Sequence, residues 1–297
     1  MRPAFVADQL RAKGLDPAAV ESLVRAALAE DLAGGVDVTS LATVPADQLS
    51  RLDLVAHAPG VLAGAAVAEL AFAIVAESSG SSIHLTRELR DGSRIDAGNV
   101  LVSVEGMTRD LLTAERTALN FLGHLCGVAT ATAAWADALA GTGAKVRDTR
   151  KTTPLLRALE KYAVRCGGGV NHRMSLSDAA LIKDNHVLAA GGVAQAFEAV
   201  RMRFPRLPIE VEVDSLDQLD EVIAVGADLI LLDNFTPQQM REAVARVAGR
   251  ARLEASGGLI LADAAEVGAT GVDYIAVGAL THSAPVLDIG ADLVAVS

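Results

Sequence analysis

From residue 145 onward, short apolar runs recur along the chain, and each run is closed by polar residues or by glycine. These runs are Lys145–Thr149, Ala179–Lys183, Ile209–Val213, Leu229–Leu232, Arg252–Ala255 and Tyr274–Val277. Four of the closing residues, Glu212, Asp233, Ser256 and Gly278, follow one another at steps of 21, 23 and 22 residues. Because each step has the length of one strand plus one helix, the pattern predicts alternating strands and helices around a parallel sheet.

Such a sheet either closes into a barrel or stays open with helices on both faces. A barrel brings the carboxyl ends of all its strands to one face, where the closing residues would form a single site. The open alternative is weakened because no GxGxxG motif follows the first strand. We therefore favour an α/β barrel for this part of the chain.

The preceding residues predict a different layer, an α+β arrangement on an antiparallel sheet. We expect helices over residues 4–29, a polar turn region over 30–43, strands at Leu52–His57, Ile83–Leu89 and Val100–Glu105, a buried helix over Val61–Ala76 and one long helix from Leu111 to Ala140. The change of domain is expected within the long helix, near residues 115–120.

The distribution of charge along the chain indicates one candidate ligand site. The chain has a formal net charge of −11, yet between Lys145 and His186 nine Lys and Arg stand against four acids. A solvated basic helix is one interpretation. However, the most basic pairs lie beside turn residues and strand ends, whereas helical charge ladders show i,i+4 spacing. Converging cations in an acidic protein indicate a small polyanion as ligand and argue against nucleic acid.

The amino-acid composition excludes some classes of function and of cellular location. Aromatic residues make up only 3% of the chain, which disfavours base-stacking and carbohydrate platforms. Cys126 and Cys166 are 40 residues apart and in no metal-binding spacing, so a reducing compartment is expected and Cys166 is interpreted as a core residue. The first residues lack an apolar signal region, and the most apolar stretch is too short to span a membrane. We expect a cytoplasmic protein.

Two carboxylates, Glu212 and Asp233, end successive predicted strands near the cations. Such a pair suits Mg²⁺ held against phosphate oxygens, although each acid could simply pair with a cation. Glycine turns close the next two strands, at Ser256-Gly257-Gly258 and Val277-Gly278, and could offer backbone N–H groups to a phosphate. Thr153-Pro154 is interpreted as the start of a helix beside Arg150.

A series of motifs extends from about residue 30 to residue 294: EDLAGGVDVTS, ERTALNFLGHLCGVATAT, DTRKTTPLLRALEKYAV, GGGVNHRMSLSDAALIKDNH, VEVDS, LILLDNF, EASGGL, GVDYIAVGALTHS and LDIGADL. Together these motifs resemble the quinolinate phosphoribosyltransferase family. The resemblance implies an N-terminal α/β sandwich domain (1–118, joined by the tail 286–297) and an open, TIM-like α/β barrel of about seven strands (119–285). It also implies a homodimer with shared active sites.

The resemblance further implies the reaction. The phosphoribosyl group of phosphoribosyl pyrophosphate (PRPP) passes to quinolinate with decarboxylation, which gives nicotinate mononucleotide, pyrophosphate and CO₂ in de novo NAD biosynthesis. The alternatives are a phosphoribosyltransferase that uses nicotinate and a non-catalytic anion-binding accessory protein on the same fold.

The same resemblance assigns roles to residues of this sequence. Quinolinate would be bound by Arg150, Lys151, His172, Arg173 and Lys183, with Arg116 from the neighbouring subunit, and Thr149 would be a further substrate-binding residue. Glu212 and Asp233 would hold the Mg²⁺ that accompanies PRPP, and Lys151, Lys183, Glu212 and Asp233 form the catalytic set. Ser256, Gly257, Gly258, Ala276, Val277 and Gly278 would bind its phosphate. The basic residues of the next helix, Arg157, Lys161 and Arg165, are expected to face solvent or an interface.

Two positions depart from the family pattern. Leu155 stands where the family usually has glycine, and Cys126 stands where it usually has serine. Neither residue carries charge, so we expect effects on loop shape and packing. The sequence leaves open whether Asp214, Asn185 or His282 contacts a ligand.

Overall fold

The structure is a computed structural model, and it describes residues 3–295. The chain forms two compact units, each described by itself below. The first unit comprises the residues up to Ala131, Thr153–Gly168 and the residues from Ser283 onward; the second comprises Thr132–Thr152 and Gly169–His282. These units are not the same division as the two sequence domains, 1–118 with 286–297 and 119–285, which stay a prediction.

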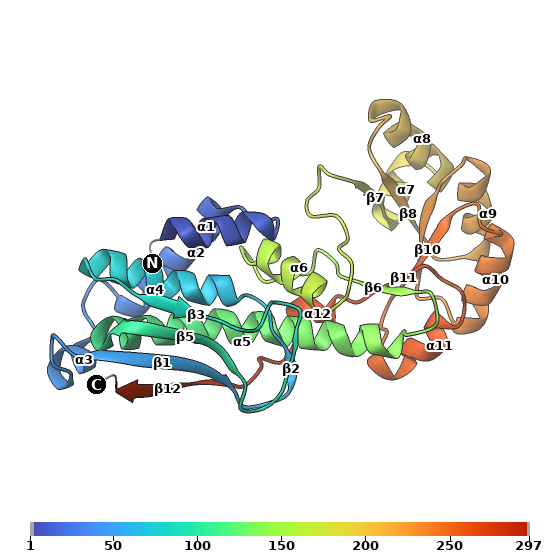
Figure 1. Cartoon of the computed structure of the whole chain (residues 1–297). Helices are drawn as coiled ribbons and strands as arrows, with labels where there is room; N and C mark the ends of the chain where they lie inside the picture. The colour runs from blue at the N-terminus through green and yellow to red at the C-terminus, as the bar shows by residue number, and fades with distance from the viewer. Residues whose placement is uncertain (1–2, 296–297) are drawn as a thin grey trace. The chain divides into compact units, whose positions relative to one another are not determined.

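The first unit is built on an antiparallel sheet (Figure 1). Its strands, in the order of the sheet, are β12 (Ile289–Ala295), β1 (Leu49–Ala56), β5 (Val100–Met107) and β3 (His84–Thr86), and β2 (Gly60–Val61) pairs with β4 (Arg94–Ile95). Its helices are α1 (Pro3–Ala12), α2 (Pro17–Leu32), α3 (Val38–Thr43), α4 (Ala65–Ser79), α6 (Arg157–Cys166) and most of α5 (Thr108–Ala138). The last strand pairs with β1 along its whole length, from Ala56 opposite Ile289 to Ser50 opposite Ala295.

The buried helix predicted over Val61–Ala76 corresponds to α4, which packs against β5 and under α1 and α2. The predicted strand over Ile83–Leu89 is shorter in the structure, only His84–Thr86. The region expected to be a turn, 30–43, contains α3, because the carboxylate of Asp37 accepts hydrogen bonds from the backbone N–H groups of Thr39 and Ser40 and caps a short helix.

The second unit contains the rhythmic part of the chain, and all six predicted strands are confirmed. They form one parallel sheet in the order β6 (Lys145–Arg147), β11 (Tyr274–Ala276), β10 (Arg252–Ser256), β9 (Leu229–Asp233), β8 (Ile209–Val213) and β7 (Ala180–Ile182). Val170 forms a parallel bridge with Arg147 at the edge of this sheet and represents a rudimentary seventh strand. The predicted open barrel is therefore present.

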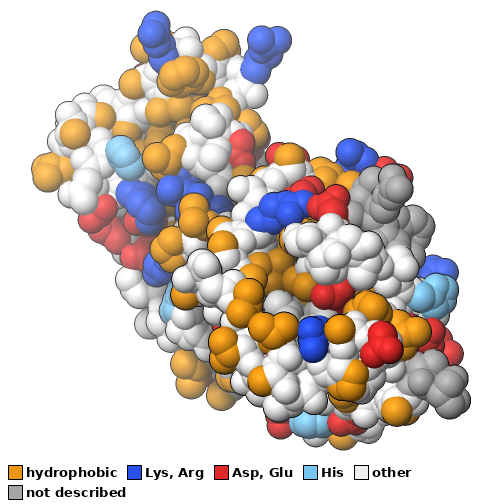
Figure 2. All heavy atoms as spheres, turned by 90° about the vertical axis from the view of Figure 1, so that its left-hand side faces the viewer, with side chains coloured by type: hydrophobic (Ala, Val, Ile, Leu, Met, Phe, Trp, Pro, Cys, Tyr) orange, Lys and Arg blue, Asp and Glu red, His pale blue; other side chains and the backbone are white. Residues whose placement is uncertain are grey.

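Helices lie on the outside of this sheet (Figure 1). They are α7 (Asp184–Ala190), α8 (Val193–Arg203), α9 (Leu216–Ala224), α10 (Pro237–Val247), a 3₁₀ turn (Leu261–Asp263), α11 (Ala264–Gly268) and α12 (Ala279–His282). None of the helices within residues 3–295 is long and apolar enough to cross a membrane. On the face drawn in Figure 2, Lys and Arg side chains form small groups among acidic, hydrophobic and uncharged ones.

The predicted start of a helix at Thr153-Pro154 is wrong. The helix α6 begins at Arg157, because Leu155 has a left-handed backbone (φ 67°) that no regular helix contains. The backbone N–H of Thr153 instead donates to the Glu160 carboxylate (3.1 Å). Lys161 on α6 is fully buried, so it does not face solvent.

A buried carboxylate in the first unit ties three helices together. Asp91 accepts hydrogen bonds from Lys13, at the end of α1 (2.9 Å), and from the hydroxyl of Tyr162 on α6 (2.6 Å). It also accepts from the backbone N–H of Ala65 (3.3 Å), where Gly64 offers α4 no side-chain cap. Burial, and then the charge of Asp91, raise the pKa of Tyr162, which keeps this hydroxyl a donor.

We predict that Asp91→Ala lowers the free energy of unfolding by about 3 kcal/mol, because it leaves the half-buried Lys13 ammonium without its carboxylate. Denaturant unfolding monitored by circular dichroism measures this loss. Asp8→Ala is the control, since its pair with Arg11 is exposed and should contribute less than about 1 kcal/mol. Equal losses in the two variants would contradict the assignment.

Candidate active site

A cavity of about 570 Å³ opens at the carboxyl ends of the strands of the second unit. It is lined by Thr149, Arg150, Lys151, His172, Arg173, Leu181, Lys183, Glu212, Leu231, Asp233, Glu254, Ser256, Gly257, Gly258, Leu259, Ala276, Val277, Gly278, Ala279 and His282. The structure thus brings together every predicted binding residue of this unit, and His282 joins them, whereas Asp214 and Asn185 are not among the lining residues. Arg116 belongs to the first unit, where it is exposed on α5.

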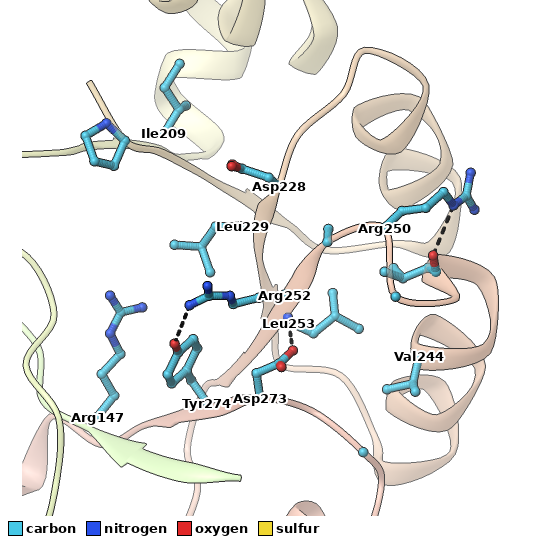
Figure 3. Close-up of a pocket in the computed structure, with 15 residues that line it drawn as sticks. Arg147, Ile209, Asp228, Leu229, Val244, Arg250, Arg252, Leu253, Asp273 and Tyr274 are labelled. Atoms are coloured by element: carbon cyan, nitrogen blue, oxygen red, sulfur yellow. Dashed lines mark hydrogen bonds between the residues drawn. The ribbon is translucent and has the colours of Figure 1, made fainter. Parts of the chain in front are cut away.

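A larger cavity of about 660 Å³ lies at the opposite, amino ends of β8 to β11 (Figure 3). Its arginines already have partners: Arg252 donates to the Tyr274 hydroxyl (2.9 Å), Arg250 to the carbonyl of Val247 (3.0 Å), and Arg147 to the Glu254 carboxylate (2.6 Å). Size therefore does not identify the ligand site, and the smaller cavity contains the arginine Nε atoms that have no acceptor among residues 3–295, those of Arg150 and Arg173.

Arg150 and Arg173 contribute two positive charges to the lining of the smaller cavity. The Nε atoms of both guanidinium groups are buried and have no hydrogen-bond acceptor within residues 3–295. Burial, and then the charge of Arg150, lower the pKa of Arg173, so these cations repel each other in a partly desolvated place. Two guanidinium groups with unused donors form a site that is stabilised when carboxylates enter it.

The acidic side of the cavity is formed by Glu212, at the end of β8, and Asp233, at the end of β9. The Glu212 carboxylate makes a short contact with the Lys183 ammonium. The pairing that we considered from sequence therefore exists for Glu212. Asp233 instead accepts a hydrogen bond from the side chain of Asn234 (2.8 Å) and stays partly exposed.

The glycine turn after β10 places backbone groups beside Asp233. Ser256 lies directly opposite Asp233 in the parallel pairing of β10 with β9. Gly257 follows with a φ of 100°, and a Cβ atom there would lie 2.1 Å from Oδ1 of Asn234, so only glycine fits. Lys151 lies across the cavity, and its carbonyl is held by the hydroxyl of Thr281 (2.8 Å).

Sequence reasoning missed two buried acids, Glu210 on β8 and Glu254 on β10. Nε2 of His172 lies 2.7 Å from Glu210 and 3.8 Å from Glu254. Burial, and then the charge of Glu210, raise the pKa of Glu254 to about 7. The signal was present in the sequence, because Glu210 precedes Glu212 by two residues and Glu254 precedes Ser256 by two, so each shares a strand face with a predicted site residue.

The two cysteines are not nucleophile candidates. Burial raises the pKa of Cys126 to about 12, and burial also raises the pKa of Cys166. Sγ of Cys126 accepts a hydrogen bond from the backbone N–H of Ala63 (3.3 Å), so this departure from the family pattern is accommodated in the core. Both cysteines are free.

Comparison with known proteins extends over both units. The model of the quinolinate phosphoribosyl transferase N-terminal domain matches residues 37–126, and that of the C-terminal domain matches residues 128–292. The chain is 54% identical to nicotinate-nucleotide pyrophosphorylase (carboxylating) from Mycobacterium leprae over 93% of this chain and 97% of the relative.

Two further relatives are less similar in sequence. The probable nicotinate-nucleotide pyrophosphorylase (carboxylating) from Bacillus subtilis is 40% identical, over 89% of this chain and 90% of the relative. The crystal structure of NadC from Streptococcus pyogenes superimposes with a TM-score of 0.90 at 40% identity, covering 95% of this chain and 99% of that one.

We predict that Gly257→Ala lowers the free energy of unfolding by about 3 kcal/mol, because it adds a clash with Asn234 to backbone strain. Gly249→Ala is the matched control, since Gly249 also has a positive φ (76°) but no atom near the new methyl group. Thermal and denaturant unfolding measure the difference between the variants. If both lose the same amount, the clash does not exist and the turn is less restrained than the geometry indicates.

Proposed function

The chain belongs to the quinolinate phosphoribosyltransferase family, and from this membership we propose that it transfers the phosphoribosyl group of PRPP to quinolinate. Loss of CO₂ accompanies the transfer, and the products are nicotinate mononucleotide and pyrophosphate, so the enzyme is a pentosyltransferase of de novo NAD biosynthesis.

One observation supports the choice of a dicarboxylate most directly. The buried Nε atoms of Arg150 and Arg173 have no hydrogen-bond acceptor among the described residues. Nicotinate has one carboxylate and would leave one guanidinium group unbalanced in a desolvated place. Quinolinate has two carboxylates on adjacent ring carbons, and each can accept hydrogen bonds from an arginine. The nicotinate-specific alternative therefore explains less of the cavity.

The opposite side of the cavity suits PRPP. The turns at Ser256–Gly258 and Ala276–Gly278 offer backbone N–H groups to its phosphate, and the Lys151 ammonium, which makes no ion pair within residues 3–295, can neutralise the leaving pyrophosphate. A non-catalytic accessory protein would bind an anion with these cations alone. It would not need the carboxylates of Glu212 and Asp233 in the same cavity.

Glu212 and Asp233 fit Mg²⁺, because both present partly exposed carboxylate oxygens to the place where phosphates would lie. We propose that these two residues hold the ion, which when bound supplies positive charge against the pyrophosphate oxygens. Lys183, now paired with Glu212, is then free to turn toward the substrate carboxylate. Lys151, Lys183, Glu212 and Asp233 are the proposed catalytic set.

The reaction needs orientation and charge more than it needs a protein nucleophile. The arginines orient the pyridine nitrogen toward the anomeric carbon, and the bond to pyrophosphate breaks as the new C–N bond forms. The ring nitrogen then carries a positive charge and accepts the electron pair left when the neighbouring carboxylate departs as CO₂. Both cysteines are held protonated by burial, in agreement with this scheme. Two free thiols also support a reducing, cytoplasmic location.

We predict that the protein releases CO₂ and pyrophosphate from quinolinate, PRPP and Mg²⁺, and that nicotinate is a poor substrate. Arg173→Ala should lower kcat/KM for quinolinate about a hundredfold, because a buried charge-assisted contact is lost. Arg241→Ala, which removes an exposed cation from α10 in the same unit, should leave the rate unchanged. Turnover of nicotinate alone would refute the choice of substrate.

We also propose a homodimer in which Arg116, exposed on α5, completes the cavity of the partner subunit. Mixing Arg116→Ala with Lys183→Ala should restore about a quarter of wild-type activity. Random exchange makes half of the dimers hybrid, and one of the two sites in each hybrid is intact. Each variant alone stays inactive. Mixtures that never regain activity after subunit exchange would refute the shared site.

A further inference from the structure

Four polar side chains meet in the interior of the open barrel, below the catalytic cavity. Arg147 extends from β6, Glu210 from β8 and Glu254 from β10, and His172 comes from the loop before β7. One guanidinium nitrogen of Arg147 lies 2.6 Å from Glu254 and 3.9 Å from Glu210. The side chain of Glu254 is fully buried, and that of Glu210 is 3% exposed. We call these residues the buried quartet.

The charges of the buried quartet do not balance without a proton. Two ionised carboxylates against one guanidinium group give a net charge of −1 when His172 is neutral. An unbalanced charge in the interior is strongly unfavourable. One proton on Glu254 makes the quartet neutral.

The atoms of His172, Glu210 and Glu254 lie within 4.8 Å of one another, which is also close enough for metal ligands. Two contacts argue against that interpretation. Nδ1 of His172 accepts a hydrogen bond from the backbone N–H of Arg173 (2.6 Å), so the proton of a neutral ring is on Nε2, the atom that faces the carboxylates. Arg147 already supplies a cation to the same oxygens.

The surroundings favour retention of the proton. Burial, and then the charge of Glu210, hold the pKa of Glu254 at about 7, although Arg147 and His172 act in the opposite direction. One oxygen of Glu254 and one of Glu210 have no hydrogen-bond partner within the described part of the chain, residues 3–295, so a carboxylic acid proton finds an acceptor nearby. Around the quartet, the Tyr274 ring stacks on Arg147, and Asp148 accepts the backbone N–H of His172 (2.8 Å).

Glu254 and His172 both line the catalytic cavity together with Arg150 and Arg173. We propose that the buried quartet is a proton-dependent support of the quinolinate site. Below its pKa Glu254 retains one proton, and loss of this proton places a negative charge beneath the bound dicarboxylate and weakens binding. This inference rests on the proposed function. By linkage, quinolinate should in turn raise the proton affinity of the quartet.

The test is the pH dependence of KM for quinolinate at saturating PRPP and Mg²⁺. In the wild type, KM should rise about tenfold as pH increases through the pKa of Glu254, because a unit charge appears several ångströms from two like charges. Glu254→Gln retains the shape but cannot ionise, so its KM should stay nearly constant over the same interval. The effect on kcat should be smaller than the effect on KM.

Glu69→Gln is the matched control, because Glu69 is another buried glutamate with a pKa raised by burial, but it pairs with Arg87 in the first unit. It should show the wild-type dependence. The inference is overturned if Glu254→Gln keeps the wild-type rise in KM. It is also overturned if the substitution raises KM by the same factor at every pH, because such a uniform increase indicates a structural role.

Infrared spectroscopy gives a measurement that requires neither turnover nor a folded variant. Wild-type spectra should lose the C=O stretching band of a buried carboxylic acid as pH rises through about 7. A spectrum without this band below that pH overturns the inference. Failure of the proposed function can be distinguished from failure of this inference. In the first case the wild-type protein would not turn over quinolinate, and the infrared result would still hold.

Discussion

Parallel pairing of strands in the second unit is the constraint on which the site depends. Register places Ser256 directly opposite Asp233, and Ala276 opposite Arg147. Because neighbouring parallel strands end at the same edge, side chains separated by more than a hundred residues reach one cavity without a long loop. Displacing one strand by a single residue would turn the acids and the glycine turn away from each other.

The cavity at the ends of these strands differs in charge from the rest of the chain. The chain as a whole is acidic, yet the cavity holds two guanidinium groups whose Nε atoms have no acceptor among residues 3–295, and one carboxylate already bound to a lysine. Such a site lowers the stability of the ligand-free protein, because like charges are partly desolvated. The same arrangement makes anionic substrates the most effective way of stabilising it.

The sequence predicted the parts of the fold that depend on local pattern. All six barrel strands are found near their predicted positions, because runs such as Leu229–Leu232 are apolar and are closed by polar residues. It did not predict features decided by the conformation or hydrogen bonds of a single residue. The α3 helix depends on Asp37, a residue in a glycine-containing stretch, and the late start of α6 depends on the backbone of Leu155.

Some residues of the candidate site could likewise be predicted from the sequence, and others could not. Its cations and acids follow strands in sequence and could be grouped through the barrel geometry alone, and the structure collects them in one cavity. Glu210 and Glu254 were missed, since a glutamate inside an apolar run suggests an exposed face until the packing shows that the face is interior. Their roles, like those of the other residues in the cavity, stay predictions.

The pairing of β12 with β1 affects how the protein can be made. The sheet of the first unit needs residues Ile289–Ala295 against a strand that leaves the ribosome more than two hundred residues earlier. During synthesis one side of β1 stays without its partner while the whole barrel is translated. The part of the chain that is made first is therefore completed last, and a nascent chain that stops before residue 289 carries an open strand edge on which other chains can assemble.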